Sequence, residues 1–319
     1  MMKFTQVIRK IFTNEDMNFL LTNRIPRHAV TVFMGWFSKI EQRWIRDLSI
    51  SVWRVFTDLD LSEAKKSHFN SLHDCFIREL REGARPINDD ERILVSPCDG
   101  IVGECGLIVR GQVFQAKGFP YQVSELLGSN VDPQSLEGGT YVTLRLTSAM
   151  YHHFHSPYSG IIDRVVYHSG DTWNVNPIAL RRIEKLFCKN ERATISMTIG
   201  SANHRIYLVP VAAILVASIR IHGLGITFHS RYKGQQLFNS HLPCSKGQEL
   251  GWFEHGSTVI VFAPAGFKLL PGVSNGVHIK MGQALFELPV VNSQLRNQDV
   301  FCNEDSSEKQ LKALENPLY

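Results

Sequence analysis

Apolar residues recur at helical spacing near the start of the chain. Five of them, mostly aromatic, follow one another at intervals of three and four positions with polar or basic residues between them: Phe33, Trp36, Phe37, Ile40 and Trp44. This spacing predicts an amphipathic helix through residues 33–44. A second helix is predicted over residues 61–82, with Ser62 as N-cap and Gly83 as a stop before Pro86.

Beyond Pro86 the pattern changes to short β-rich runs separated by glycine and proline. Residues 140–147 and 258–262 are the clearest strands, and a short helix is predicted over residues 176–187. Two turns share the pattern Ser-Pro-x-x-Gly followed by branched apolar residues, at residues 96–102 and 156–162. Such paired turns resemble the half-repeats of biotinyl and lipoyl domains, which are barrel-sandwich folds.

We therefore predict the α+β class, with an N-terminal helical segment followed by a β-rich core that is barrel-sandwich-like. Three parts are expected: a helical segment at residues 1–85, the β-rich catalytic core at 86–292, and a polar, mobile C-terminal tail at 293–319.

Composition and charge narrow the setting without selecting a function. The net charge of +4 mildly favours anionic partners, and no nucleic-acid partner is expected. The longest mainly apolar stretch, residues 207–217, contains Pro210 and is too short to span a bilayer, and the first ten residues lack a signal-peptide pattern. The six cysteines form no C-x-x-C pair, which indicates reduced thiols in a cytosolic setting.

The aromatic stripe between residues 33 and 44 has two interpretations. The helix could pack on its own domain, or it could lie in a lipid interface with its tryptophans inserted and its arginines outside. Periodicity alone favours packing on the domain, since this is the commoner fate of such a stripe.

Three places in the chain could carry chemistry. They are Asp99 in a Pro-Cys-Asp-Gly turn, the histidine cluster at residues 151–155, and Ser257 before a predicted strand. Three imidazoles within four positions are hard to explain as core packing. No partner stands at zinc-ligand spacing, so we expect no metal and favour acid–base or nucleophile-activating work.

Asp99, His155 and Ser257 together supply the parts of a nucleophile triad. Ser257 has no Gly-x-Ser-x-Gly setting, so it could attack its own chain and not a substrate. On an ideal strand His153 and His155 share a face while His152 lies on the other, so cooperation between His152 and His155 would require a bend.

The combination of motifs closely resembles the phosphatidylserine decarboxylase family, the pyruvoyl-dependent lyases of phospholipid synthesis, in its bacterial membrane-associated form. The likeness covers nearly the whole chain. Its motifs are Phe76-Ile77-Arg78-Glu79-Leu80-Arg81 with Arg85-Pro86, Ser96-Pro97-Cys98-Asp99-Gly100, Ala116-Lys117-Gly118, Tyr151-His152-His153-Phe154-His155-Ser156-Pro157, Asn190-Glu191-Arg192, and Lys246-Gly247-Gln248-Glu249-Leu250-Gly251 before Gly256-Ser257-Thr258.

The resemblance implies a proenzyme that cleaves itself between Gly256 and Ser257, with Asp99, His155 and Ser257 as the cleavage triad. Ser257 then becomes a covalent pyruvoyl group, which forms a Schiff base with phosphatidylserine and releases CO₂ to give phosphatidylethanolamine. By the same analogy His152 is the candidate acid that protonates the carbanion. The two cleavage chains would form a heterodimer, alone or within a higher oligomer.

A substrate that stays in the bilayer also changes the interpretation of the aromatic helix. The resemblance implies peripheral docking on the cytoplasmic side of the cell membrane, with Trp36, Phe37 and Trp44 buried and Arg43 and Arg46 against anionic headgroups.

The chain departs from the family pattern at three positions. It carries His153 where Arg is common, His255 where Leu is common, and Cys98 where Ala or Val is common. Loss of the arginine removes a fixed cation beside the histidine cluster.

Two other functions remain as alternatives. One is an uncleaved serine hydrolase that uses Asp99, His155 and Ser257. The other is a non-catalytic carrier module of barrel-sandwich type. Against this alternative, the sequence lacks the exposed lysine in a hairpin that such modules need.

Overall fold

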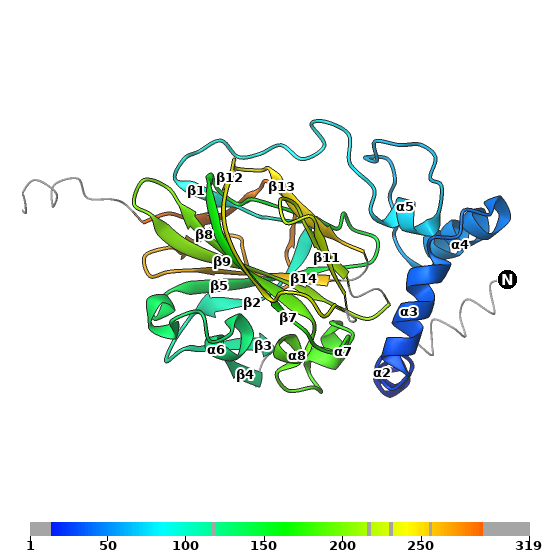
Figure 1. Ribbon diagram of the computed structural model, residues 1–319, viewed down its shortest axis with the longest axis horizontal. Coiled ribbons are helices and arrows are strands. Elements are labelled where there is room, and N and C mark those ends of the chain that lie inside the picture. Colours follow the sequence, from blue (N-terminus) through cyan, green and yellow to red (C-terminus); the bar gives the residue numbers. More distant parts are fainter. Residues whose placement is uncertain (1–13, 117–118, 216–217, 230–231, 255–256, 290–319) are drawn as a thin grey trace, which may run out of the picture. The chain divides into compact units, whose positions relative to one another are not determined.

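A computed structural model describes residues 14–116, 119–215, 218–229, 232–254 and 257–289 (Figure 1). The described residues from 14 to 288 belong to one compact unit. The predicted tail at 293–319 lies outside the described residues, and the predicted boundary at residue 85 stays a prediction. The N-terminal helices are α2 (Glu15–Asn23), α3 (Arg27–Phe37), α4 (Arg43–Phe56) and α5 (Leu72–Phe76).

The helix predicted through residues 33–44 is wrong in its extent, because α3 ends at Phe37 and α4 begins only at Arg43. Ser38, in the break, is fully buried, and its carbonyl accepts a hydrogen bond from the His73 backbone at 2.8 Å. This contact with a segment far along the chain fixes the break, so the aromatic stripe is divided between two helices.

The helix predicted over residues 61–82 is also wrong, since only α5 is helical there. The segment instead folds back on itself through a bridge between Ala64 and Leu80. The Lys65 backbone donates to the Glu79 carbonyl at 2.9 Å, so cross-chain pairing replaces the helical hydrogen bonds. The Ser71 side chain caps α5 at its N-terminus.

The helix predicted over residues 176–187 is present as two short pieces, α7 (Pro177–Leu180) and α8 (Leu186–Lys189). The Asn176 side chain caps the first piece. Lys185 has a φ of 53°, a left-handed conformation that interrupts the helix just before α8.

The described part of the β-rich core contains four antiparallel sheets, so the predicted α+β class is confirmed (Figure 1). None of the sheets closes into a barrel within the described ranges. The eight-stranded sheet has the order β12 (Leu237–Cys244), β7 (Gly160–His168), β8 (Arg192–Ile199), β9 (His204–Ala212), β14 (Ser257–Ala263), β5 (Thr140–Leu146), β2 (Gly100–Leu107) and β16 (His278–Ile279). The four-stranded sheet has the order β11 (Ile226–His229), β10 (Ser218–Ile221), β13 (Glu249–Phe253) and β6 (His153–His155).

Two smaller sheets and two short helices complete the described core. The sheets are β1 (Ile93–Val95), β17 (Ala284–Glu287) and β15 (Lys268–Leu269), and β3 (Gln112–Ala116) with β4 (Phe119–Gln122). The helices are α6 (Val123–Leu127) and the 3₁₀ turn η1 (Pro133–Leu136).

The eight-stranded sheet is buried on both faces at its centre, as the alternation along β14 shows. Val259 and Val261 enter one apolar cluster together with Phe154 of β6 and Phe253 of β13. Ile260 and Phe262 enter another, which includes residues of α6, α7 and α8. The central strand is therefore apolar from Val259 to Ala263, as a strand buried on both faces requires.

The two Ser-Pro-x-x-Gly turns have the same internal geometry. Ser96 Oγ donates to the Cys98 carbonyl at 2.8 Å, and Ser156 Oγ donates to the Tyr158 carbonyl at 2.6 Å. Each turn leads into a strand, β2 or β7, as the sequence pattern predicts.

The two turns also hydrogen-bond to each other in a reciprocal way. The His155 backbone donates to the Pro97 carbonyl at 2.7 Å, and the Val95 backbone donates to the Pro157 carbonyl at 3.0 Å. This crossing places His155 beside the turn that carries Asp99.

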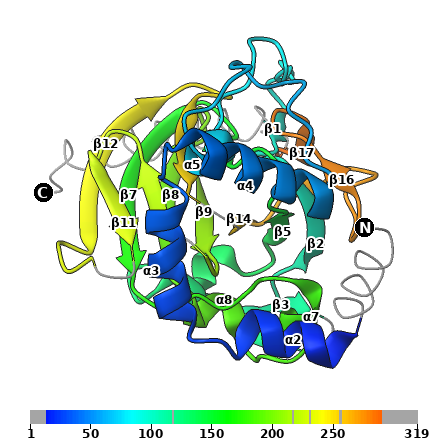
Figure 2. The ribbon, with the colours of Figure 1, turned by 90° about the vertical axis from the view of Figure 1, so that its right-hand side faces the viewer.

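Helices α2, α3 and α4 lie along one side of the β-rich core, as Figure 2 shows. Arg27 of α3 forms an ion pair of 2.6 Å with Asp171, and the Leu215 backbone donates to Thr31 Oγ1 at 3.2 Å. Both contacts join α3 to the segments around the central sheet.

No helix in the described ranges is both long and apolar enough to cross a membrane.

A matched pair of glycine substitutions tests this packing. A Cβ at Gly251 of β13 would meet the Arg220 carbonyl and would lie 2.8 Å from the Phe154 ring, whereas one at Gly35 of α3 would meet nothing within 4 Å. We expect Gly251→Ala to cost about 3 kcal/mol through overpacking and Gly35→Ala to stabilise by roughly 0.5–1 kcal/mol. Denaturant unfolding measures both, and equal effects would contradict the packing.

Candidate active site

Ser257 is the first residue of β14 and lies in the middle of the central sheet. It pairs with Leu146 of β5 on one side and with Ala212 of β9 on the other. Its side chain is fully buried, and its Oγ has no hydrogen-bond partner among the described residues. An unpartnered buried hydroxyl costs about 1–3 kcal/mol, so a functional reason for it is to be sought.

The other side of the predicted cleavage bond cannot be placed. Gly256 and His255 lie outside the described residues, as do Lys117 and Gly118 of one matched motif and Cys302. The five cysteines within the described ranges are free thiols.

His155 is the last residue of β6 and is 7% exposed. Its Nδ1 lies 2.9 Å from the Gly247 carbonyl oxygen, and its Nε2 lies 3.0 Å from the Tyr151 hydroxyl. A carbonyl oxygen only accepts, so Nδ1 carries the proton and Nε2 accepts the Tyr151 hydrogen. Nε2 is therefore the basic atom of this imidazole.

The surroundings of His155 favour its neutral form. Burial lowers the pKa of the imidazole, and the hydrogen bond to Gly247 and the nearby Glu249 carboxylate only partly oppose this. The result is a histidine ready to act as a base near neutral pH.

Asp99 is joined to Arg85 and not to His155. Arg85 donates from Nε and from an Nη to the two carboxylate oxygens at 2.8 and 2.6 Å, and the Met281 backbone donates to Oδ1 at 2.9 Å. Within the described ranges no hydrogen bond links Asp99 to His155. The Gly247 carbonyl orients the imidazole, a role that a carboxylate usually has in such a triad, while the Asp99 charge raises the pKa of His155.

His152 occupies a different side of its strand from His155. The Phe253 backbone donates to the His152 carbonyl at 3.0 Å, which continues the β13–β6 ladder, so alternation turns His152 toward the same core as Phe154. In the eight-stranded sheet, Ser257 and Val259 are two residues apart on β14, so their side chains lie on the same face. Val259 belongs to that core. His152 and Ser257 therefore border the same core from two sheets.

His152 is itself fully buried and held on two sides. Its Nδ1 lies 2.9 Å from the Met150 carbonyl oxygen, and its ring centroid lies 4.1 Å from that of Phe76.

His153, the departure from the family pattern, pairs with a carboxylate. Its Nδ1 lies 3.0 Å from Glu249 Oε2, and His222 Nε2 lies 2.8 Å from Glu249 Oε1. Burial alone would raise the pKa of the Glu249 carboxyl. The two histidines outweigh this effect and lower the pKa to about 2. A permanent anion thus stands beside the histidine cluster.

Sequence reasoning missed the roles of Arg85, Tyr151 and Gly247. All three stand in the matched motifs, but which side chain or carbonyl meets which partner depends on the crossing of the two turns. A single sequence shows no sign of that crossing.

Within the described ranges no cluster of three His, Cys, Asp or Glu side chains could hold a metal ion. The buried, unpartnered Ser257 hydroxyl fits a group derived from that residue.

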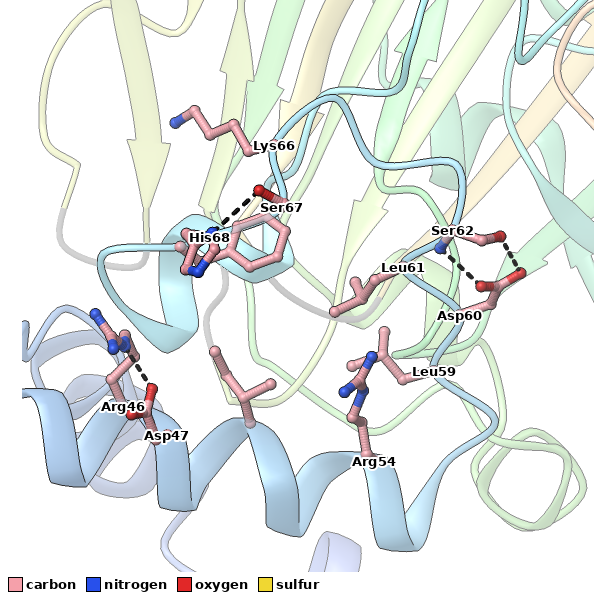
Figure 3. Close-up of a pocket in the computed structure, with 12 residues that line it drawn as sticks. Arg46, Asp47, Arg54, Leu59, Asp60, Leu61, Ser62, Lys66, Ser67 and His68 are labelled. Carbon is pink, nitrogen blue, oxygen red and sulfur yellow. Dashed lines mark hydrogen bonds and ion pairs between the residues drawn. The ribbon is translucent and has the colours of Figure 1, made fainter.

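A cavity of about 540 Å³ lies elsewhere, between α4 and the loop that follows it (Figure 3). Its polar groups are partly paired with one another, Arg46 with Asp47 and Ser62 with Asp60. None of the candidate catalytic residues lines it.

The chain is similar to a known protein family and to several of its members. The family model described as phosphatidylserine decarboxylase matches residues 72–287. The chain belongs to this family. The chain is 31% identical over 282 residues to the phosphatidylserine decarboxylase proenzyme of Saccharophagus degradans (86% of this chain, 98% of the relative), and 32% identical over 285 residues to that of Aliivibrio salmonicida (84% and 97%). The proenzyme of Yersinia enterocolitica is 31% identical over 288 residues (86% and 97%).

Substitution of Arg85 tests whether it supports Asp99. Arg85→Gln leaves a buried carboxylate without its cation, which should cost about 3 kcal/mol. Arg92→Gln, which removes a solvent-exposed pair with Asp90, should cause no measurable loss. Thermal unfolding of both variants checks this, and an Arg85→Gln protein as stable as Arg92→Gln would contradict the assignment.

Proposed function

We propose that the chain is the proenzyme of a pyruvoyl-dependent phosphatidylserine decarboxylase that cleaves itself between Gly256 and Ser257. The observation that carries this proposal is the fully buried, unpartnered Ser257 hydroxyl at the head of the central strand. Family membership supports the substrate, and the proenzyme names of the relatives support processing.

In the proposed cleavage, His155 Nε2 removes the Ser257 hydroxyl proton and the oxygen attacks the Gly256 carbonyl to give an ester. β-Elimination releases the upstream chain, and hydrolysis of the resulting enamine yields ammonia and the pyruvoyl group. The hydrogen bond between Tyr151 and His155 Nε2 must be exchanged for one to Ser257 in this step.

Asp99 contributes a fixed charge to the proposed cleavage. Held by Arg85, it remains a buried carboxylate close to His155, where it favours the imidazolium that forms as the proton is taken up. The triad of Asp99, His155 and Ser257 thus works through the field of the carboxylate, while the Gly247 carbonyl orients the ring.

The ladders around β14 support a stable heterodimer of the two cleavage chains. Residues from Ser257 onward pair with β5 and β9, which both belong to the upstream chain. Downstream of the cut, β16 pairs with β2 and β17 pairs with β1. Separation would break backbone hydrogen bonds across several strands, so the chains remain together after cleavage.

The pyruvoyl carbonyl supplies the electron sink for loss of CO₂ from phosphatidylserine. His152 is the proposed acid that returns a proton to the substrate carbon. Its Nδ1 donates to the Met150 carbonyl, so Nε2 is the nitrogen that moves the proton.

We also propose that the protein docks peripherally on the cytoplasmic face of the cell membrane. Trp36 of α3 and Trp44 of α4 are 64% and 65% exposed, and Leu48 and Val55 extend the apolar surface of α4. Of the other residues expected to take part, Phe37 is half-buried and Arg46 is engaged by Asp47.

Variants of the proposed catalytic residues test processing and turnover separately. Ser257→Ala should remain one chain without decarboxylase activity, because it lacks the nucleophile. His152→Ala should still cleave but lose most of its turnover, because only the proton donor is missing. Denaturing electrophoresis and CO₂ release report the two steps. Activity in uncut Ser257→Ala, or fluorophosphonate labelling of Ser257 in an intact wild-type chain, would favour the hydrolase alternative.

The lowered pKa of His155 predicts the pH dependence of self-cleavage. Cleavage needs the neutral imidazole, so its rate should be constant near pH 7 and fall only below the ordinary histidine value of about 6.5. Cell-free synthesised proenzyme, shifted to a series of pH values, gives this profile. A midpoint above 6.5 would show that the site favours the charged imidazole and would contradict the proposed base.

The docking surface is tested by removing exposed apolar groups. Trp44→Ser with Val55→Ser should weaken binding to anionic vesicles by about tenfold or more, while self-cleavage continues. The matched control is Leu107→Ser with Val109→Ser, which removes exposed apolar groups from the end of β2 and the loop beyond it. Vesicle flotation measures both, and an equal loss in the control would argue against a specific surface on α4.

A further inference from the structure

Three rings in contact connect α4 to the proposed acid, the first pair stacked and the second tilted. The ring centroids of Trp53 in α4 and Phe76 in α5 are 5.8 Å apart with 24° between the planes. Those of Phe76 and His152 are 4.1 Å apart at 38°. Phe76 is 2% exposed and His152 fully buried, so the stack passes from the half-buried α4 into the protein interior.

The end of α5 holds two consecutive histidines of the cluster. Phe76 packs on His152, and the next carbonyl, that of Ile77, accepts a hydrogen bond from His153 Nε2 at 3.0 Å. On its other side His152 is fixed by the Met150 carbonyl. The direction of the His152 ring is therefore set jointly by Met150 and by Phe76.

Helix α4 carries the proposed lipid contact on the side opposite to Trp53. Trp44 and Trp53 are nine residues apart, which is two and a half helical turns. Trp44 is exposed, whereas Trp53 is half-buried and stacks on Phe76. Trp53 thus links α4 directly to Phe76.

An open pocket lies beside α4, between this helix and the loop that follows it. It is lined by Ile50 and Arg54 of α4 and by Phe69 of the facing loop (Figure 3). On this side α4 has fewer packing contacts than a helix that is covered by protein all round, so a small shift of the helix would cost less.

We propose that Phe76 is a positioning residue for His152 and that Trp53 couples lipid contact by α4 to the orientation of the His152 ring. This inference rests on the proposed roles of His152 and of α4. It adds that docking adjusts the proton donor as well as bringing the enzyme to its substrate.

The test follows the His152 ring by NMR in the full-length Ser257→Ala protein with ¹³C-labelled histidine, and a His152→Gln variant assigns the resonance. Isotropic bicelles that contain phosphatidylglycerol provide the lipid surface. We expect the His152 resonance to move when bicelles are added. We expect Phe76→Leu to move it without lipid, because the ring that stacks on it is gone, and Trp53→Leu to abolish the response to lipid. The control, Phe69→Leu, alters the same small core outside the stack and should preserve the response.

An unchanged chemical shift of the His152 resonance when bicelles are added to the parent protein would overturn the coupling. So would Phe69→Leu acting like Trp53→Leu. If Phe76→Leu fails to fold, Trp53→Leu on the surface helix decides the matter. Because these measurements use the uncut chain, their outcome is independent of whether a pyruvoyl group forms.

A kinetic arm uses the processed enzyme and monodisperse short-chain phosphatidylserine. Phe76→Leu should lower kcat about tenfold with little change in KM, since it affects proton transfer and not binding. In a His152→Ala background the same substitution should have no further effect, because Phe76 acts through His152. Additive losses in the double variant would overturn the positioning role.

Discussion

The two backbone ladders that hold β14 between β5 and β9 are the constraint on which the rest depends. They place Ser257 at a fixed point inside the protein, where its hydroxyl is shielded from water and without a partner in the described structure. Paired on both sides, the strand cannot slip by one residue without turning its apolar side chains to the wrong face. The proposed chemistry thus takes place at the end of a rigid element, and the new chain end would remain held after cleavage.

The titratable groups near Ser257 differ in the charge state that their surroundings favour. His155 is driven toward its neutral form because its surroundings disfavour a cation, while Asp99 has an arginine of its own. Glu249 stays ionised because His153 and His222 both contact it. The result is a neutral base near fixed anions, which lowers the cost of the imidazolium formed when the base takes up a proton.

Much of the core could be predicted from sequence because its signals are local. The strands at residues 140–147 and 258–262 are apolar enough to be recognised, and the two serine turns carry their own hydrogen bonds. The prediction of a helix over residues 61–82 was wrong because tertiary contacts outweighed the helical sequence signals. Backbone pairing between Lys65 and Glu79 replaces the helical hydrogen bonds there. The site residues were found through motifs, but the pairing of Asp99 with Arg85 depends on how distant segments meet, which periodicity does not encode.

The most direct test of the account is the intact mass of the purified wild-type protein under denaturing conditions. The account predicts two chains that meet at the bond between Gly256 and Ser257. The downstream chain should be lighter by one ammonia than a chain that begins with serine, as a pyruvoyl end requires. A single chain of full mass in a preparation that decarboxylates phosphatidylserine would contradict the central claim.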